Sequence, residues 1–182
     1  MKVFLKMAGV LAIIGAVCSF LLAAVNDMTL ERRENAVKQE KVDALKAVLP
    51  EFDNSPMDDV IKLGDKEVYT AKKNKKTIAY AVLSSDFGGY SGEVQLMVGI
   101  TPDIKIYKAK VVKHNETPGL GSKSEKPKFI DQFMKKAAKD MSVNKDGGNI
   151  DAISGATITS RAVCRAAKQA LELVEKNKSK LK

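Results

Sequence analysis

The longest apolar stretch of the chain runs from Met7 to Val25, and its 19 residues include no charged side chain. As an α-helix this stretch spans about 28 Å at about 1.5 Å per residue, which matches the hydrocarbon core of a bilayer. The apolar part of a cleaved signal peptide is usually about 7–15 residues long, and the residues after Ala23 fit a cleavage site poorly. We therefore predict a retained transmembrane anchor at residues 7–25.

Lysines before the anchor predict its orientation. Lys2 and Lys6 precede the apolar stretch, whereas a long domain follows it, and long domains can be exported whatever their charge. Arg32 and Arg33 on the far side weaken this asymmetry, although acidic residues are interleaved with them. We expect residues 1–6 in the cytoplasm, a single pass through the cell (inner) membrane, and the rest of the chain on the extracytoplasmic side.

Residues 26–50 follow the anchor and place apolar residues among charged ones at mostly helical spacings. The apolar positions are Leu30, Val37, Val42, Leu45 and Val48. Thr29 is a candidate N-cap, and Pro50 closes the run because proline cannot continue a helix. The pattern predicts a stalk helix that lies on a following domain at residues 51–182.

Pairs of segments that flank short polar turns predict two antiparallel strand pairs in the first half of that domain. Glu67–Ala71 and Ile78–Leu83 flank a polar turn around Asn74. Glu93–Ile100 and Ile104–Val112 are joined by a Thr-Pro-Asp turn, in which proline fixes one dihedral and aspartate can bond the backbone. Each pair is expected to lie side by side in an antiparallel sheet.

The second half of the domain is predicted to be mostly helical. A short helix is expected at Lys128–Lys139, a turn at Gly147-Gly148 leads into Asn149–Ile153, and a long helix covers Thr159–Asn177. The long helix has an apolar face beside a charged one, which favours packing on the sheet. The predicted fold class is therefore α+β, with a mainly antiparallel sheet and flanking helices.

Composition narrows the chemistry that the chain can perform. It has 31 Lys and Arg against 22 Asp and Glu, for a net charge of +9, but the lysines are scattered among only 4 Tyr, 6 Phe and no Trp. No nucleic-acid partner is therefore expected. Cys18, Cys164 and His114 are too few and too widely spaced for a disulfide framework or a metal site. Cys164 lies in the predicted long helix, where we expect it to pack.

Three glycine-containing segments lie at the ends of predicted strands or helices, at residues 88–92, 114–121 and 154–160. Because glycine lets the backbone approach a ligand closely, they could form three walls of one pocket, although each alone is more often just a turn. The third segment precedes the long helix, whose unpaired N–H groups favour a phosphate. The residues alone leave an alternative open, in which Thr159 or Ser160 caps that helix.

The same three segments carry a family resemblance. Residues 151–157, DAISGAT, resemble the flavinylation motif of the FMN-binding domain family, an aspartate followed by S-G-A-T. HNETPGLG at 114–121 resembles that family's E-T-P-G-L-G segment, and GGYSGEVQLMVGI at 88–100 resembles its glycine-tyrosine-glycine entry to a strand. With one N-terminal span and 182 residues, the chain is most similar to the G subunits of Rnf-type ferredoxin:NAD oxidoreductases. It is also similar to the usually longer C subunits of sodium-translocating NADH:quinone oxidoreductases.

The resemblance implies that FMN is bound covalently, through a phosphoester to Thr157, and that a flavin transferase attaches it from FAD. By chemistry alone Thr159 and Ser160 could also carry a phosphate. Asp151 would serve in recognition by the transferase, or it caps the preceding turn. The other residues implied in cofactor binding are Ser154, Gly155, Ala156, Glu116, Thr117, Leu120, Gly121 and Tyr90.

In that family the E-T-P-G-L-G loop packs beside the isoalloxazine ring. This implies polar contacts to the ring from Glu116 and Thr117 and an apolar contact from Leu120. Tyr90 could contact the ring or pack elsewhere. His114 could hydrogen-bond the flavin or a neighbouring subunit, or it could be an ordinary histidine at a strand end.

The function implied by the resemblance is that of an electron-transfer subunit in an ion-translocating redox complex, with the other subunits and the membrane as partners. No catalytic side chain is expected, because the flavin would supply the redox chemistry. The isolated chain is expected not to oxidise NADH, since it lacks a G-x-G-x-x-G motif between a strand and a helix. Alternatives are a flavin domain of another respiratory or extracellular electron-transfer chain, and a non-catalytic, membrane-tethered envelope module.

Overall fold

The computed structural model describes residues 2–181, which fall into two compact units, one up to Lys41 and one from Val42 onward. A single helix, α1 (Lys2–Val48), forms the first unit and continues into the second. Apolar side chains of its N-terminal half, such as Phe4, Leu11 and Phe20, are exposed. Among the described residues, α1 is the one helix whose length and apolar composition suit a membrane crossing.

Thr29 does not cap a helix, so the prediction of an N-cap there is wrong. It lies inside α1, where its hydroxyl donates hydrogen bonds to the carbonyl oxygens of Val25 at 2.9 Å and Asn26 at 3.1 Å. A threonine in a helix interior often bonds back to the preceding turn in this way. Since neither proline nor glycine lies between the apolar stretch and Thr29, nothing in the backbone ends the helix before it.

The second unit contains a five-stranded antiparallel sheet in which every strand pairs with its neighbour in the sequence. The strands are β1 (Val60–Leu63), β2 (Lys66–Lys73), β3 (Lys76–Gly89), β4 (Gly92–Ile100) and β5 (Ile106–His114). Both predicted strand pairs are confirmed, whereas the short β1 was not predicted. Strand β5 begins later than expected, because Ile104 has a positive φ of 61° and belongs to the turn.

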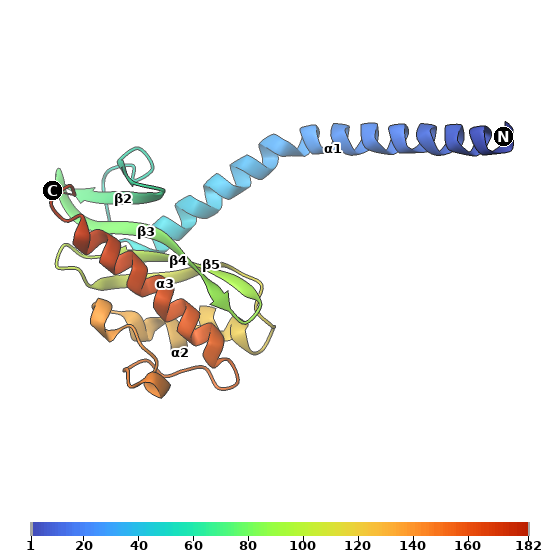
Figure 1. The fold of residues 1–182 in the computed structure, drawn as a ribbon. Helices are drawn as coiled ribbons and strands as arrows, with labels where there is room; N and C mark the ends of the chain where they lie inside the picture. The colour runs from blue at the N-terminus through green and yellow to red at the C-terminus, as the bar shows by residue number, and fades with distance from the viewer. Residues whose placement is uncertain (1, 182) are drawn as a thin grey trace. The chain divides into compact units, whose positions relative to one another are not determined.

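Helix α3 (Thr157–Lys176) covers one face of this sheet, as the sequence predicts, and lies across β3 and β4 (Figure 1). Its buried alanines, such as Ala162 and Ala166, share a hydrophobic cluster with strand residues such as Val82 and Leu96. On the opposite face, Ala44, Leu45 and Val48 from the last turns of α1, with Leu49 just after it, join a second cluster with β2, β3 and β4. Gly99 in β4 leaves room there for the backbone of Val48. The α+β class is confirmed.

The connection between β5 and α3 contains short helical turns in place of the predicted helix at Lys128–Lys139, and that prediction is wrong. The turns are η1 (Gly121–Glu125), α2 (Pro127–Ile130), η2 (Asp131–Phe133), η3 (Ala138–Asp140) and η4 (Asn144–Asp146). The helical conformation ends at Lys135, whose φ is 63°. There the backbone N–H of Lys135 donates to the carbonyl of Ile106 at 2.7 Å, and the N–H of Ile106 donates to Lys136 at 3.0 Å. Pairing with the start of β5 thus replaces helical hydrogen bonds.

Candidate functional site

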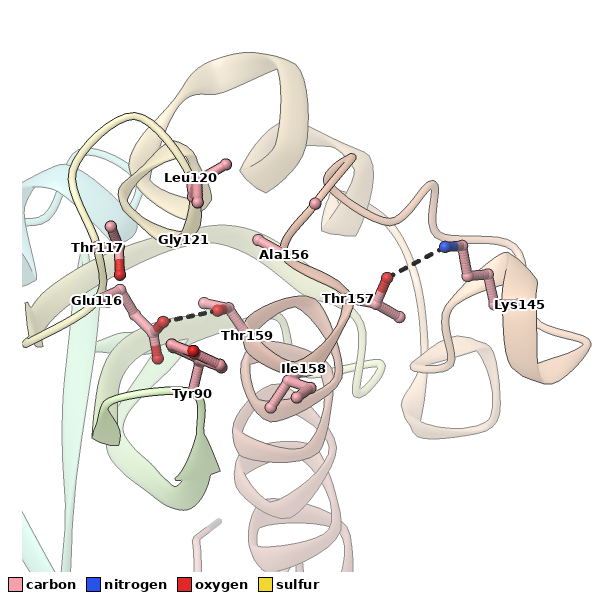
Figure 2. Close-up of a pocket in the computed structure, with 11 residues that line it drawn as sticks. Tyr90, Glu116, Thr117, Leu120, Gly121, Lys145, Ala156, Thr157, Ile158 and Thr159 are labelled. Carbon is pink, nitrogen blue, oxygen red and sulfur yellow. Dashed lines mark hydrogen bonds between the residues drawn. The ribbon is translucent and has the colours of Figure 1, made fainter.

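The three glycine-containing segments meet around a cavity of about 600 Å³ beside the first turn of α3 (Figure 2). Residues from the β3–β4 hairpin, from the loop after β5, from η4 and from the start of α3 line it. They are Tyr90, Glu116, Thr117, Leu120, Gly121, Lys145, Gly155, Ala156, Thr157, Ile158 and Thr159. Of the residues implied in cofactor binding, Ser154 does not line this cavity. Ile158 and Thr159 of the third segment also line it, as does Lys145, which lies outside all three segments and was not predicted.

A buried carboxylate joins these walls. Glu116 is only 5% exposed, and its Oε2 accepts a hydrogen bond from the Thr159 hydroxyl at 2.8 Å. Its Oε1 accepts the backbone N–H of Ser91 at 3.3 Å. One side chain therefore connects the loop after β5 with the β3–β4 hairpin and with α3. These hydrogen bonds offset the free-energy cost of burying a polar group.

Glycines on two sides make room for this carboxylate. A Cβ atom at Gly121 would lie 2.6 Å from Glu116 Oε2, and a Cβ atom at Gly89 would lie 2.6 Å from Glu116 Oε1. Both distances are shorter than a real carbon–oxygen contact, so larger residues would displace the Glu116 side chain. Gly89 and Gly121 are therefore needed for this close approach.

His114 does not line the cavity but contacts the backbone of the loop after β5. Its Nδ1 accepts the backbone N–H of Glu116 at 3.0 Å, and its Nε2 lies 2.7 Å from a carboxylate oxygen of Glu125. Because Nδ1 acts as an acceptor, the ring proton lies on Nε2, which is close to Glu125 but makes no hydrogen bond with it. The histidine holds the end of β5, the following loop and η1 together.

The first turn of α3 presents three hydroxyl groups in different ways. Thr157 is the first residue of α3, after Ala156, which provides no side-chain cap. Thr159 and Ser160 are fully buried and lie inside α3, after its start at Thr157, so the predicted alternative in which one of them caps the helix is wrong. Thr159 donates to Glu116, while Ser160 Oγ accepts the N–H of Ile153 at 2.9 Å and donates to the carbonyl of Ala156 at 2.9 Å. Only Thr157 keeps its hydroxyl at the cavity surface, half-buried.

A cation lies beside Thr157. The Nζ of Lys145 donates a hydrogen bond to Thr157 Oγ at 3.2 Å (Figure 2). The next residue, Asp146, accepts two hydrogen bonds from Arg161, from Nε at 2.8 Å and from a terminal nitrogen at 2.6 Å. These bonds from Arg161 hold the pKa of Asp146 below its ordinary value. The sequence does not reveal this contact, because Lys145 and Thr157 are 12 positions apart and no helical or strand periodicity relates them.

A second cavity of about 660 Å³ contains the other half of the DAISGAT segment. Its lining residues are Lys123, Lys126, Lys128, Phe129, Gln132, Asp151, Ala152, Ile153 and Ser154. The side chain of Asp151 accepts a hydrogen bond from Asn144 at 3.0 Å, and its backbone N–H donates to the Gln132 side chain at 2.7 Å. The segment thus divides between two cavities, with Asp151 and Ser154 in one and Gly155 to Thr157 in the other.

The β3–β4 hairpin is attached to α3 through Arg165. Its guanidinium donates to both carboxylate oxygens of Asp86, at 2.7 and 2.9 Å, and to the carbonyl of Gly88 at 3.2 Å. These hydrogen bonds hold the pKa of Asp86 below its ordinary value. The neighbouring Cys164 is buried in the core, as expected, and burial raises the pKa of its thiol to about 12.

Comparison with known proteins identifies the family. Residues 89–172, which contain every residue that lines the first cavity, match the FMN-binding domain. The chain is 36% identical over 193 aligned positions to the G subunit of the Na(+)-translocating ferredoxin:NAD(+) oxidoreductase complex of Acetobacterium woodii, covering 96% of this chain and 93% of that one. The chain belongs to the family of G subunits of ion-translocating oxidoreductase complexes.

A second G subunit agrees with this placement, and two solved structures of a different subunit share the fold of the domain. The G subunit of the proton-translocating ferredoxin:NAD(+) oxidoreductase complex of Clostridium ljungdahlii is 46% identical, although the match spans only 61% of each chain. Among solved structures, NqrC of Shewanella oneidensis matches with a TM-score of 0.53 and 25% identity over 64% of this chain and 60% of that one. The C subunit of the Na(+)-translocating NADH-quinone reductase of Parabacteroides distasonis matches with a TM-score of 0.51 and 26% identity over 63% of each.

The residues around the first cavity of this family member fit FMN. The cavity volume of about 600 Å³ lies within the usual range for cofactor sites, roughly 300–1,000 Å³. Partly exposed apolar side chains of Tyr90, Leu120 and Ile158 line it and suit a planar ring. The ammonium of Lys145 and the uncapped start of α3 suit a phosphate. The lining therefore offers both of the surfaces that a flavin nucleotide needs.

Proposed function

We propose that this chain is the electron-transfer subunit of a membrane-bound, ion-translocating ferredoxin:NAD oxidoreductase of the Rnf type, and that it relays electrons through FMN attached covalently to Thr157. Membership of the G-subunit family and the FMN-binding domain support the redox role. The observation that carries the attachment site is the state of the three hydroxyls. Thr159 and Ser160 are buried and committed to internal hydrogen bonds, whereas Thr157 lies at the cavity beside a cation.

The attachment is a phosphoryl transfer from FAD by a flavin transferase. A bond forms between Thr157 Oγ and the phosphorus next to the riboflavin part, the pyrophosphate bond of FAD breaks, and adenosine monophosphate leaves with the hydroxyl proton passing to the leaving group or to solvent. Recognition by the transferase is supported by the exposure of Asp151 and Ser154, which line the second cavity and not the first.

In the loaded protein, the chain's own residues position the cofactor. The isoalloxazine would lie between Tyr90, Leu120 and Ile158, with Glu116 and Thr117 at its polar edge. The flavin supplies the one-electron chemistry, while fixed charges and donors of the protein tune it. No catalytic side chain is needed, and ion translocation belongs to the complex with its other subunits.

The anchor places this redox domain at the membrane. Helix α1 crosses once, with residues 1–6 in the cytoplasm and the flavin domain outside, since Lys2 and Lys6 hold the start of the helix inside. A covalent bond is useful on that side, where lost FMN is not easily replaced. Digestion of intact, wall-stripped cells with protease should cleave the domain. If the domain survives protease in intact cells and is cleaved in inverted vesicles, the proposed orientation is wrong.

The experiment that tests the attachment is the intact mass of the full chain, purified in mild detergent after production together with a flavin transferase. We expect an excess mass of one FMN less water, located by peptide mapping on the peptide that contains Thr157. Thr157→Ala should lose the excess, whereas Thr159→Val should keep it. An unmodified wild-type chain, or a modified Thr157→Ala chain, would contradict the proposal.

The electron-transfer role has its own measurement. The purified flavinylated chain should bleach with dithionite but show no appreciable NADH oxidation, because it lacks a dinucleotide-binding motif. Purification from native membranes should recover further redox subunits. Rapid oxidation of NADH by the single chain would favour a separate enzyme, and a stable colourless protein would favour the envelope-module alternative.

A further inference from the structure

We propose that Lys145 is the positioning residue for the flavin attachment, first directing Thr157 Oγ for phosphoryl transfer and then neutralising the phosphate of the ester. This inference rests on the attachment proposed above. Among the described residues that line the first cavity, Lys145 is the only cation, and its ammonium already contacts the oxygen that would form the bond. Figure 2 shows the side chain reaching from η4 toward Thr157.

The neighbouring ion pair holds Lys145 in place. Thr157 and Arg161 are four residues apart in α3 and therefore lie on the same face of the helix. Lys145 and Asp146 are consecutive in η4, so the two segments make two parallel contacts, Lys145 with Thr157 and Asp146 with Arg161. A two-bond contact between guanidinium and carboxylate has a fixed geometry. The Asp146–Arg161 pair thus fixes the backbone position from which the flexible Lys145 side chain extends.

The backbone of η4 is also fixed. The N–H of Gly147, which has a φ of 79°, donates to the carbonyl of Asn144 at 3.1 Å, and the N–H of Gly148 donates to Val143 at 3.0 Å. Val143 forms a bridge with Ile150. The turn therefore returns the chain directly to the DAISGAT segment, and the lysine and its target are held by one short, hydrogen-bonded loop.

The charge balance leaves Lys145 available for an anion. Arg161 is already neutralised by Asp146, and the acidic residue of the cavity lining, Glu116, is bonded to Thr159. The one contact of Lys145 found among the described residues is with the neutral Thr157 hydroxyl. A phosphodiester carries one negative charge, which this ammonium balances, and a fixed cation beside a phosphoryl group also stabilises charge that develops during transfer.

The bonds in the step are those of the attachment itself, with a pyrophosphate-linked flavin nucleotide as donor. The Thr157 oxygen–phosphorus bond forms, the bond from phosphorus to the departing nucleotide breaks, and the threonine proton leaves with that nucleotide or to solvent. The contribution of Lys145 is to orient the oxygen and to hold the oxygens of the phosphate, not to exchange a proton.

The test measures the rate of FMN incorporation into the full chain in detergent, with purified transferase and FAD, by intact mass. Lys145→Gln should slow incorporation by roughly tenfold or more, because a preorganised donor to a developing charge is lost. Lys145→Arg should restore part of the rate, and Asp146→Asn should slow it less than Lys145→Gln. Lys139→Gln is the matched control, since this exposed lysine of η3 does not line the cavity.

A second readout reports the finished ester. After prolonged modification, the phosphorus NMR signal of Lys145→Gln should be shifted from that of wild type, whereas Lys139→Gln should leave it unchanged. Equal urea unfolding midpoints exclude a folding defect. Incorporation into Lys145→Gln at the wild-type rate with an unshifted phosphorus signal would overturn the role of Lys145 and leave the attachment intact. An unmodified wild-type chain would overturn the attachment itself.

Discussion

At the scale of single residues, the buried Glu116 carboxylate is the group that connects the walls of the first cavity. The Thr159 hydroxyl bonded to its Oε2 is fully buried, so water cannot readily replace it. Thr159→Val keeps the shape of the side chain and removes only the donor. We expect it to lower the free energy of unfolding by about 1–3 kcal/mol, the penalty for a buried polar group that loses its partner. Urea unfolding of the full chain in detergent measures the change.

Thr157→Val is the matched control for this prediction. It makes the same chemical change two residues earlier, at a half-buried hydroxyl that solvent can reach. We expect a stability change within about 0.5 kcal/mol, typical of surface positions, together with loss of the flavin. Equal destabilisation by the two substitutions would mean that the Thr159–Glu116 bond has no special importance.

The residues of the site were only partly predictable from the sequence. The three glycine-containing segments could be selected because glycines at element ends mark close approach, and the structure does bring them together around one cavity. Lys145 could not be found, since its contact with Thr157 depends on the η4 turn and on the Asp146–Arg161 pair. Thr159 and Ser160 were wrongly considered as caps because α3 begins two residues earlier than its apolar pattern suggests.

At the scale of secondary-structure elements, the Asp86–Arg165 pair attaches the β3–β4 hairpin to α3. Asp86 is nearly buried, whereas the Arg165 side chain is 46% exposed. Asp86→Asn should therefore destabilise the protein by about 1–2 kcal/mol at neutral pH, less than for a fully buried pair. Asp103→Asn is the control, because Asp103 forms an exposed pair with Lys105 and should matter much less.

The pH dependence of this effect follows from the lowered pKa of Asp86, which the hydrogen bonds of Arg165 cause. A carboxyl whose pKa is lower in the folded state adds stability above its ordinary value of 3.8 and loses it as pH falls through the folded-state value. The difference in unfolding free energy between wild type and Asp86→Asn should thus be constant above about pH 5 and shrink below pH 3.8. A difference that grows on acidification would contradict the pair's role.

Elements with a strong local pattern were predicted well, and elements that depend on distant contacts were not. Strands β2 to β5 are separated by short polar turns, and α3 has a clear apolar face. The expected helix at Lys128–Lys139 failed because the backbone at Lys135 pairs with Ile106 in β5, a contact between residues far apart in sequence. Strand β1 has only four residues, too few for alternation to be recognised.

At the scale of the whole molecule, the boundary between the two units lies inside a continuous helix. Residues up to Lys41 form one unit, and the last turns of α1 belong to the other. Leu45, Val48 and Leu49 are buried against the sheet, at 2%, 0% and 6% exposure. Burying each such side chain contributes about 1.5–3 kcal/mol. Together they contribute several kcal/mol, a large share of the roughly 5–15 kcal/mol that holds a typical domain folded.

This boundary predicts how two truncated chains differ. Residues 42–182 retain both hydrophobic clusters and lack the apolar stretch, so this chain should be soluble without detergent and unfold cooperatively in urea. Residues 50–182 lack Leu45, Val48 and Leu49, so their sheet face is uncovered, and this chain should be strongly destabilised or aggregate. Equal unfolding midpoints for the two chains would show that the end of α1 adds nothing to the fold. Sedimentation of the 42–182 chain with membranes would show a second means of attachment besides the helix.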